Sequence, residues 1–202
     1  MYFNKISKEY FIGPDVVALS RDLLGKYLMT DLDGLITGGM IVETEAYAGR
    51  KDKACHAHMN KRTNRTRIMY EEGGVAYVYL CYGIHYLFNI ITNVAGMADA
   101  ILIRAIEPKV GIDVMLQRRK LDKKIPRLTA GPGVMSQALG INKTHYGESL
   151  VGDLIWLEDR GVKVKSDEII ASTRIGVDYA EEDALLPWRF SLKNNCWVSK
   201  GR

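Results

Sequence analysis

Residues 41–47 read Ile41-Val-Glu-Thr-Glu-Ala-Tyr47 and form the centre of the segment on which the predicted fold depends, Gly39 to Tyr47. Successive side chains of a β-strand point to opposite faces of its sheet, so this alternation places Glu43, Glu45 and Tyr47 on one face. Two carboxyl groups and a phenol ring are thereby directed into one space. The same pattern also fits a strand whose polar face meets solvent, and the segment alone favours neither interpretation.

Further strands are predicted on the carboxyl side of this segment, where β-branched and aromatic residues are again frequent. They cover residues 75–80, 86–92, 100–106 and 154–157, and shorter strands are expected near the carboxyl end. Strands that gather in the middle of the chain, with helices on either side, do not match a regular βαβ repeat. The sequence therefore predicts a mixed α+β fold.

Helices are predicted at three places from proline, capping and glycine signals. The first opens at Pro14 and ends near Gly25. The second follows Pro108 and carries apolar and basic residues, namely Val110, Val114, Met115, Arg118 and Arg119. The third begins in Thr129-Ala-Gly-Pro-Gly and ends at Gly140. The amide groups at the start of this third helix are suited to hold a phosphate.

An aromatic-rich segment, Val75 to Asn89, predicts two strands joined by a tight turn close to Gly83. Tyr82 would then stand at or beside the tip of this hairpin, where an aromatic ring is poorly buried. Such a ring can enter a base step of DNA as a wedge and partly unstack it. It can equally pack against a neighbouring side chain, and the segment leaves both roles open.

Length and composition fit one soluble domain spanning residues 1–202, since 47% of the residues are hydrophobic. No apolar stretch has the length of a signal peptide or a membrane span, so we expect an intracellular protein, cytoplasmic or nuclear, that is not secreted. Cys55, Cys81 and Cys196 are far apart and form no CxxC pair. They predict neither a disulfide framework nor a zinc ribbon.

The net charge of +4 is unevenly distributed along the chain. Residues 50–67 hold seven basic residues and one acid, and a second basic cluster covers residues 118–127. A surface with this polarity suits a phosphate backbone, because its lysines and arginines replace the counterions that DNA binds. Basic residues spread evenly over a solvated surface would not indicate a nucleic-acid partner.

Eight blocks in the same order make the sequence similar to the alkyladenine (3-methyladenine) DNA glycosylase family over nearly its whole length. The blocks are Leu23-Leu-Gly-Lys, Ile41-Val-Glu-Thr-Glu-Ala-Tyr-Ala-Gly, Tyr77-Val-Tyr-Leu-Cys-Tyr-Gly, Leu102-Ile-Arg-Ala-Ile-Glu-Pro, Gly131-Pro-Gly, Gln137-Ala-Leu-Gly-Ile-Asn-Lys, Arg174-Ile-Gly-Val and Trp188-Arg-Phe. The resemblance implies a single domain with a central curved, largely antiparallel sheet, a protruding β-hairpin and surrounding helices. It implies no metal and no cofactor.

The same resemblance implies the catalytic groups. Glu45 corresponds to the glutamate that activates a water molecule. Arg104 and the main-chain carbonyl of Ile175 correspond to groups that position this water. Glu43 is then a neighbour of the catalytic residue and not a second catalyst.

DNA-binding roles also follow from the resemblance. Tyr47, His56 and Tyr79 fall on the aromatic pocket for a flipped base, and Tyr82 falls on the intercalating residue. Asn89 corresponds to the side chain that helps to exclude guanine. We nominate three further positions, Arg65, Arg67 and Gly133, as contacts to the DNA backbone.

The activity expected from the resemblance is base excision repair by a monofunctional, monomeric glycosylase. Damaged purines such as 3-alkyladenine and hypoxanthine would be flipped out of double-stranded DNA, and hydrolysis of the N-glycosidic bond would leave an abasic site. An electron-rich aromatic pocket favours cationic or electron-poor purines, because a positive ring is attracted by the quadrupole of each aromatic face. Alkylated adenines have this character and are good leaving groups.

Two other functions remain open at this stage. In a metal-dependent nuclease the ligands would be acidic and imidazole side chains, namely Glu43, Glu45, Asp52 and His56, although no compact ligand motif fixes their geometry. A nucleic-acid binder without catalytic activity would stack bases on Tyr77, Tyr79 and Tyr82. His58, His85 and His145 are expected to be ordinary surface or hydrogen-bonded histidines.

Overall fold

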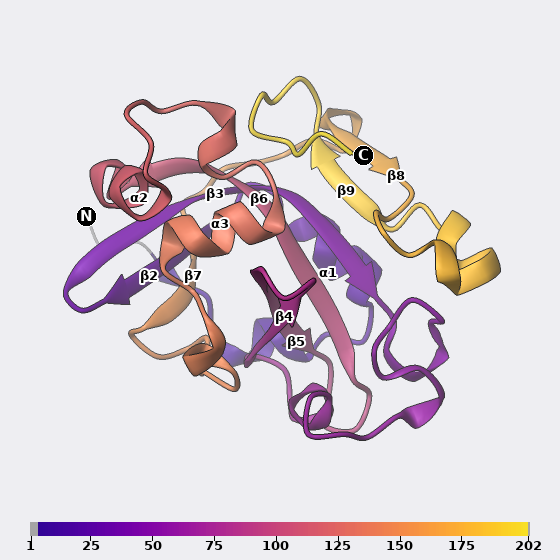
Figure 1. Cartoon of the computed structure of the whole chain (residues 1–202). Coiled ribbons are helices and arrows are strands. Elements are labelled where there is room, and N and C mark those ends of the chain that lie inside the picture. Colours follow the sequence, from indigo (N-terminus) through magenta and orange to yellow (C-terminus); the bar gives the residue numbers. More distant parts are fainter. Residues whose placement is uncertain (1–3, 202) are drawn as a thin grey trace.

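One antiparallel sheet organises the chain in the computed structural model (Figure 1), which describes residues 4–201. Residues 1–3 and 202 of the predicted domain lie outside the described residues. Nine strands within the described part follow the order β1-β7-β2-β3-β6-β5-β4, with β9 paired to β3 and β8 to β9. The sheet is open and helices pack against it, so the predicted mixed α+β class is confirmed.

The strands are β1 (Asn4–Lys5), β2 (Tyr27–Leu32), β3 (Leu35–Tyr47), β4 (Ala76–Cys81), β5 (His85–Thr92), β6 (Asp99–Val110), β7 (Ile155–Asp159), β8 (Ile169–Ser172) and β9 (Arg189–Leu192). The α-helices are α1 (Val16–Asp22), α2 (Ile112–Arg119) and α3 (Pro132–Leu139). Short 3-10 helices cover Lys8–Ile12, Gly49–Lys51, His58–Asn60, Arg67–Tyr70, Pro126–Leu128, Lys143–His145, Ser166–Glu168 and Asp178–Leu185. From residue 4 to residue 201, no helix combines the length and the apolar character that crossing a membrane requires.

Strand β3 holds the central position because both of its edges are paired over its second half. One edge pairs with β6, and the other pairs first with β2 and then with β9. The register with β6 is irregular on both sides of Glu43, where the ladder shifts. Such a bulge re-aims side chains and is common beside functional sites. Glu43 and Glu45 are thus fixed in the middle of the sheet and far from a free edge.

Helices α1 and α3 lie against different faces of the strands, with α1 behind them and α3 in front in Figure 1. Asp15 caps α1 by accepting hydrogen bonds from the main-chain N–H groups of Val17 and Ala18 at 3.0 and 2.9 Å. The Ser20 hydroxyl of α1 donates to Thr44 at 3.0 Å. Because Thr44 and Glu45 point to opposite faces of β3, the glutamate is directed away from α1.

The predicted elements need two corrections. Pro108 and Val110 belong to β6, and α2 begins only at Ile112. Proline was expected to open a helix because it suits a first turn, but here it stands opposite Gly39, where the register between β3 and β6 shifts. Strands β1 and β2 were not predicted. The first helix, the third helix and its end at Gly140 are confirmed.

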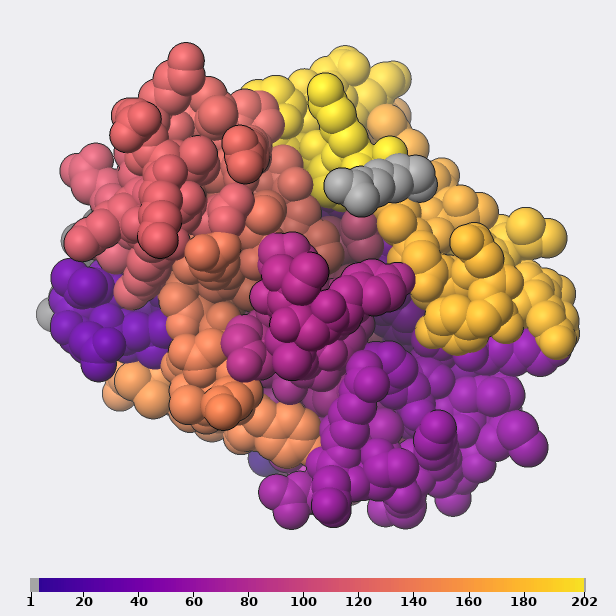
Figure 2. Space-filling view, in the orientation of Figure 1, coloured from indigo at the N-terminus to yellow at the C-terminus, as the bar shows by residue number. Residues whose placement is uncertain are grey.

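Hairpin β4–β5 projects from the molecule, as predicted. In Figure 2 it stands in the middle of one face in magenta, and the surface is hollowed beside it. The purple segment around residues 50–70 and the orange to yellow segment around residues 170–185 border this hollow. The main features of this face are therefore a protruding hairpin and the concave surface beside it.

Candidate active site

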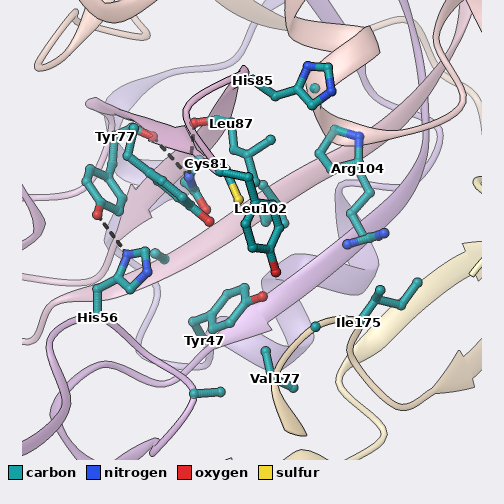
Figure 3. A pocket seen from close by; sticks show the side chains of 18 of the residues that line it. Tyr47, His56, Tyr77, Cys81, His85, Leu87, Leu102, Arg104, Ile175 and Val177 are labelled. Carbon is teal, nitrogen blue, oxygen red and sulfur yellow. Dashed lines mark hydrogen bonds between the residues drawn. The ribbon is translucent and has the colours of Figure 1, made fainter. Parts of the chain in front are cut away.

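The hollow is a pocket of about 830 Å³, within the size range of small-molecule sites. Strands β3 to β6, residues 54–69, the start of α3 and residues 175–179 contribute to its wall. Figure 3 shows Tyr77 and His56 at one end and Arg104 and Ile175 at the other, with Tyr47 between them. Segments distant in sequence thus converge on one cavity at the base of the hairpin.

Glu45 is completely buried directly behind this wall. Its Oε1 accepts a hydrogen bond from the Ile175 amide at 2.9 Å and forms an ion pair with Nη1 of Arg104 at 3.0 Å. Its Oε2 accepts from the Tyr47 hydroxyl at 2.7 Å. All three donor residues line the pocket, so the carboxylate lies one layer behind the surface of the cavity.

The catalytic residues expected from the resemblance are therefore brought together. Arg104 contacts Glu45 directly and is itself buried. Ile175 was expected to act through its main-chain carbonyl, and the contact found in this structure is made by its amide nitrogen. Both residues hold the carboxylate in one orientation.

Glu43 is the structural neighbour of this carboxylate. It accepts hydrogen bonds from Nε of Arg104 at 2.9 Å, from Nε of Arg189 at 2.8 Å and from the amide and hydroxyl of Ser199 at 2.7 and 2.8 Å. Its side chain has no exposed surface. The interpretation of this strand face as a solvated one is wrong, because both glutamates are buried and bonded to several donors.

A second buried ion pair supports the site from behind and was not predicted. Both terminal nitrogens of Arg174 contact the Asp52 carboxylate, one of them at 2.9 Å, and neither side chain is exposed. The guanidinium also lies 4.9 Å from the Tyr47 ring centroid. Since Arg174 precedes Ile175 in the chain, this pair fixes the segment whose amide holds Glu45.

Tyr47, His56 and Tyr79 all line the pocket and give it aromatic surface. His56 and Tyr79 are 4.8 Å apart between ring centroids and meet edge to face. Burial and the nearby Glu45 carboxylate raise the pKa of Tyr47, which keeps its hydroxyl protonated as a donor. Tyr77, also at this wall, contacts Nδ1 of His56 through its hydroxyl at 2.8 Å (Figure 3).

Asn89 lies on β5 opposite Tyr77 and lines the pocket. Its side-chain amide donates to the main-chain carbonyls of Tyr77 at 3.0 Å and Leu87 at 3.4 Å. These bonds lock the side chain and leave its amide oxygen as the atom that can serve a bound molecule.

Tyr82 stands at the tip of the hairpin with 88% of its surface exposed. Tyr82 and Gly83 both have positive φ, 50° and 70°, as the two central residues of a type I′ turn do. A tyrosine in this left-handed region costs about 1–2 kcal/mol. Of the two roles left open, packing against a neighbour does not account for a ring that is so exposed.

The three residues nominated for the DNA backbone are placed differently from one another. Arg65 reaches into the aromatic wall, where its Nη2 lies 3.1 Å from Nε2 of His56. Arg67 is exposed and points toward the Tyr146 ring. Gly133 is buried at the start of α3, and a Cβ there would come within 2.6 Å of the His85 side chain. Only glycine allows α3 to approach the hairpin so closely.

Two arginines of the second basic cluster, at residues 118–127, form hydrogen bonds within the protein. Arg118 donates to Thr37 and to the Ala138 carbonyl, and Arg119 donates to Gln137 and to the Arg127 carbonyl. These two guanidinium groups hold α2 to the end of α3. Their charge alone had suggested a surface for phosphates.

The acidic groups of the nuclease alternative are engaged by arginines. Asp52 pairs with Arg174, and Glu43 and Glu45 share Arg104. In residues 4–201, no three His, Cys, Asp or Glu side chains gather in a metal-binding cluster. Carboxylates bonded to guanidinium groups are directed toward those groups, which does not favour a nuclease that uses them as ligands.

Comparison with known proteins agrees with this geometry. The family model described as "Methylpurine-DNA glycosylase (MPG)" matches residues 10–196. A protein of Chlamydia felis named "Putative 3-methyladenine DNA glycosylase" is 45% identical over 188 residues, which cover 93% of this chain and 95% of that protein. Relatives of the same name from Natranaerobius thermophilus and Alkaliphilus oremlandii are 42% and 41% identical over 96% and 97% of this chain and 98% and 99% of their own. The chain therefore belongs to the methylpurine-DNA glycosylase family and is a DNA glycosylase, a hydrolase that acts on alkylated bases.

Proposed function

We propose that this glycosylase flips damaged purines, including 3-alkyladenine and hypoxanthine, out of double-stranded DNA and hydrolyses their N-glycosidic bonds with water activated by Glu45. The observation that carries the proposal is the carboxylate of Glu45, buried against a pocket with an aromatic wall and oriented by Tyr47, Arg104 and Ile175. A base inside duplex DNA cannot reach such a pocket unless it leaves the stack.

The reaction follows from these positions. The bond between C1′ and the base nitrogen breaks, and its electron pair leaves with the base, which neutralises an alkylated, cationic purine. A neutral base such as hypoxanthine leaves as an anion and takes up a proton from water. Positive charge develops on the sugar, where a nearby carboxylate stabilises it. A water oxygen bonds to C1′ while the carboxylate of Glu45 accepts the water proton, and the products are free base and an abasic site.

The Tyr47 hydroxyl marks the direction from which water reaches the carboxylate. This hydroxyl is 2.7 Å from Oε2 of Glu45, which is the distance of a hydrogen-bonded water. Tyr47 itself lines the pocket. We infer that a small displacement of the ring, when a base stacks on it, lets a water bond to Oε2 while Oε1 stays bonded to Arg104 and Ile175.

Recognition of the base is assigned to the opposite part of the pocket. His56 and Tyr79 offer aromatic surface, which favours a cationic purine ring. Asn89 is locked by two hydrogen bonds, so it cannot turn away from a purine that carries an additional 2-amino group. We infer that this rigidity disfavours guanine.

The proposal is tested by measuring free base released from duplexes that contain 3-methyladenine, hypoxanthine or only normal bases, each with a chelator present. We expect release from the two damaged duplexes, no release from the normal duplex and an intact sugar–phosphate backbone. Cleavage of the backbone that stops in chelator would show a metal-dependent nuclease. Tight DNA binding without any released base would show a binding protein. Release of guanine from the normal duplex would contradict the role of Asn89.

Replacing Tyr82 by serine is expected to weaken affinity for a lesion-containing duplex and to slow excision by about tenfold or more. The reason is that the exposed ring fills the gap that a flipped base leaves, and unstacking a base step costs a few kcal/mol. Binding is measured by fluorescence anisotropy and excision by single-turnover base release.

Ile84→Ser is the matched control for this variant, because Ile84 is in the same turn and 73% exposed. We expect it to have a smaller effect than Tyr82→Ser. Equal losses in both variants would show that general apolar contact at the tip determines binding, and no loss in either would show that the tip does not contribute. Both outcomes contradict a Tyr82 wedge.

A further inference from the structure

The most exposed apolar side chains of the described chain gather around the pocket. Between residues 4 and 201, the large hydrophobic residues with more than half of their surface exposed are Met59, Tyr82, Ile84, Tyr179 and Leu185. They lie on residues 50–70, on the tip of hairpin β4–β5 and on residues 170–185, the three segments that surround the hollow in Figure 2. Apolar groups that are concentrated in one exposed region mark an interaction surface, whereas single ones need no explanation.

Met59 is the member of this group whose side chain the fold explains least. It is 82% exposed, so it adds little to any core. Its φ is 54° and that of Asn60 is 62°, in the left-handed region that glycine adopts most readily. Neither packing nor backbone conformation therefore calls for a methionine at this position, and its side chain is available to a partner.

The turn that carries Met59 is fixed by hydrogen bonds at its base. The Lys61 N–H donates to the His58 carbonyl at 3.2 Å and closes the turn. The Lys61 carbonyl accepts from the Thr66 hydroxyl at 2.8 Å and from the Tyr70 hydroxyl at 3.1 Å. Because this main chain is already ordered, a contact through Met59 restricts only side-chain bonds, which lowers the entropic cost of binding.

Met59 lies close to the place where the flipped base is expected. It follows His56 of the pocket wall by three residues, and three residues span at most about 11 Å. Nucleotides of one DNA strand are about 3.4 Å apart along the duplex, so this distance corresponds to about three of them. A base that stacks on His56 therefore brings the nucleotides beside the lesion within reach of Met59.

The charges around Met59 favour DNA as its partner. Residues 50–67 hold seven basic residues and one acid, a composition suited to a polyanion. The phosphates of a strand alternate with deoxyribose groups, whose C–H surfaces accept apolar contacts. Methionine is among the apolar side chains that proteins place in the minor groove. An exposed methionine between basic residues fits this alternation of sugar and phosphate.

We propose that Met59 contacts the deoxyribose groups next to the flipped nucleotide and thereby holds the lesion strand at the mouth of the pocket. This inference rests on the proposed function and adds to it a contact that is independent of base sequence. The contact acts on affinity for the lesion duplex and not on bond cleavage, because Met59 is not among the residues that line the pocket.

The test compares Met59→Gly with Asn60→Gly. Both place glycine in the left-handed turn, which suits it, so both variants should be at least as stable as the wild type in thermal unfolding. Only Met59→Gly removes the apolar side chain, and Asn60→Gly controls for the added flexibility of the loop. Met59→Leu keeps an apolar side chain and should bind almost as the wild type does.

The measurement is single-turnover release of hypoxanthine over a range of enzyme concentrations, which gives the half-saturating concentration and the maximal rate. We expect Met59→Gly to raise the half-saturating concentration by about three- to thirtyfold and to leave the maximal rate unchanged. Full burial of a methionine corresponds to about ten- to a hundredfold, and a groove contact buries only part of the side chain. Asn60→Gly should leave both quantities unchanged.

Salt dependence separates this contact from an indirect effect on the neighbouring basic residues. Fluorescence anisotropy with the same duplex gives Kd at several salt concentrations. The slope of log Kd against log salt concentration should be the same in Met59→Gly and in the wild type, because no phosphate contact is lost. A shallower slope would assign the loss to displaced lysines or arginines and would overturn the proposal.

The remaining outcomes distinguish this inference from the proposed function. If the wild type releases neither hypoxanthine nor 3-methyladenine, the proposed function fails, and anisotropy still decides whether Met59 contributes to binding. If the wild type releases both bases and Met59→Gly binds as tightly as the wild type, only the contact is refuted. An equal loss in Asn60→Gly would assign the effect to loop flexibility and would refute it as well.

Discussion

Replacing Glu45 by glutamine is expected to reduce base release by about a hundredfold to ten-thousandfold, the usual contribution of a general base, while DNA binding is retained. The substitution keeps the shape of the side chain. The amide oxygen of glutamine can still accept from Arg104 and Ile175, and the Tyr47 hydroxyl can turn to accept from the new amide. The carboxylate that takes the water proton and faces the charged sugar is lost.

The measurement is single-turnover release of 3-methyladenine in chelator, with duplex affinity determined in parallel. Glu43→Gln is the matched control, since Glu43 lies on the same strand, is equally buried and shares Arg104. We expect this control to lose less activity than Glu45→Gln because Glu43 is bonded to Arg189 and Ser199 and does not meet the water. Equal losses would assign the effect to the placement of Arg104 and would contradict a unique role of Glu45.

Replacing Arg174 by methionine is expected to lower the free energy of unfolding by about 3–5 kcal/mol, because it leaves Asp52 as a buried charge without its partner. The variant should also lose activity at temperatures where it is folded. The reason is that the guanidinium contacts Tyr47 and holds the segment whose Ile175 amide bonds to Glu45. Urea denaturation at constant pH measures the first effect, and base release measures the second.

Two comparisons test the explanation for Arg174. Adding Asp52→Asn to Arg174→Met removes the unpaired charge, so the double variant should recover part of the lost stability. Lys53→Met breaks exposed ion pairs with Glu181 and Glu182 and should have a much smaller effect than Arg174→Met. Stability of Arg174→Met within about 0.5 kcal/mol of the wild type, the effect of an ordinary surface substitution, would show that the pair is not needed for folding.

Local patterns in the sequence predict much of this fold. The alternation in β3, the glycine at the turn between β4 and β5, and the caps of α1 and α3 are signals carried by a few neighbouring residues. Strand β2 was missed because its alternation is interrupted by Thr30 and Asp31. Thr30 is buried, and its hydroxyl contacts that of Thr37 on β3 at 2.7 Å. A threonine that finds its partner on another strand gives no local sign of burial.

The candidate site shows the same limit. Glu45, Tyr47 and Tyr82 lie in segments whose alternation or turn signals place them, and the resemblance supplied their expected roles. The pairing of Asp52 with Arg174 and of Glu43 with Ser199 joins residues 122 and 156 positions apart. Contacts over such separations leave no periodic pattern in the sequence. Arg65 was predicted to bind phosphate because of its charge, and only the folded geometry shows its contact with Tyr79.

The contacts of Ile175 and Ser199 with the two glutamates have a consequence for biosynthesis. Both glutamates leave the ribosome long before the residues that donate to them, since synthesis proceeds from the amino end. Until Ser199 has left the ribosome, Glu43 lacks the two hydrogen bonds that the Ser199 amide and hydroxyl donate. Burial of a carboxylate without these donors is unfavourable. The central part of the sheet is therefore expected to close around the glutamates only after translation has passed this point, so that catalytic competence arises only once Ser199 has been synthesised.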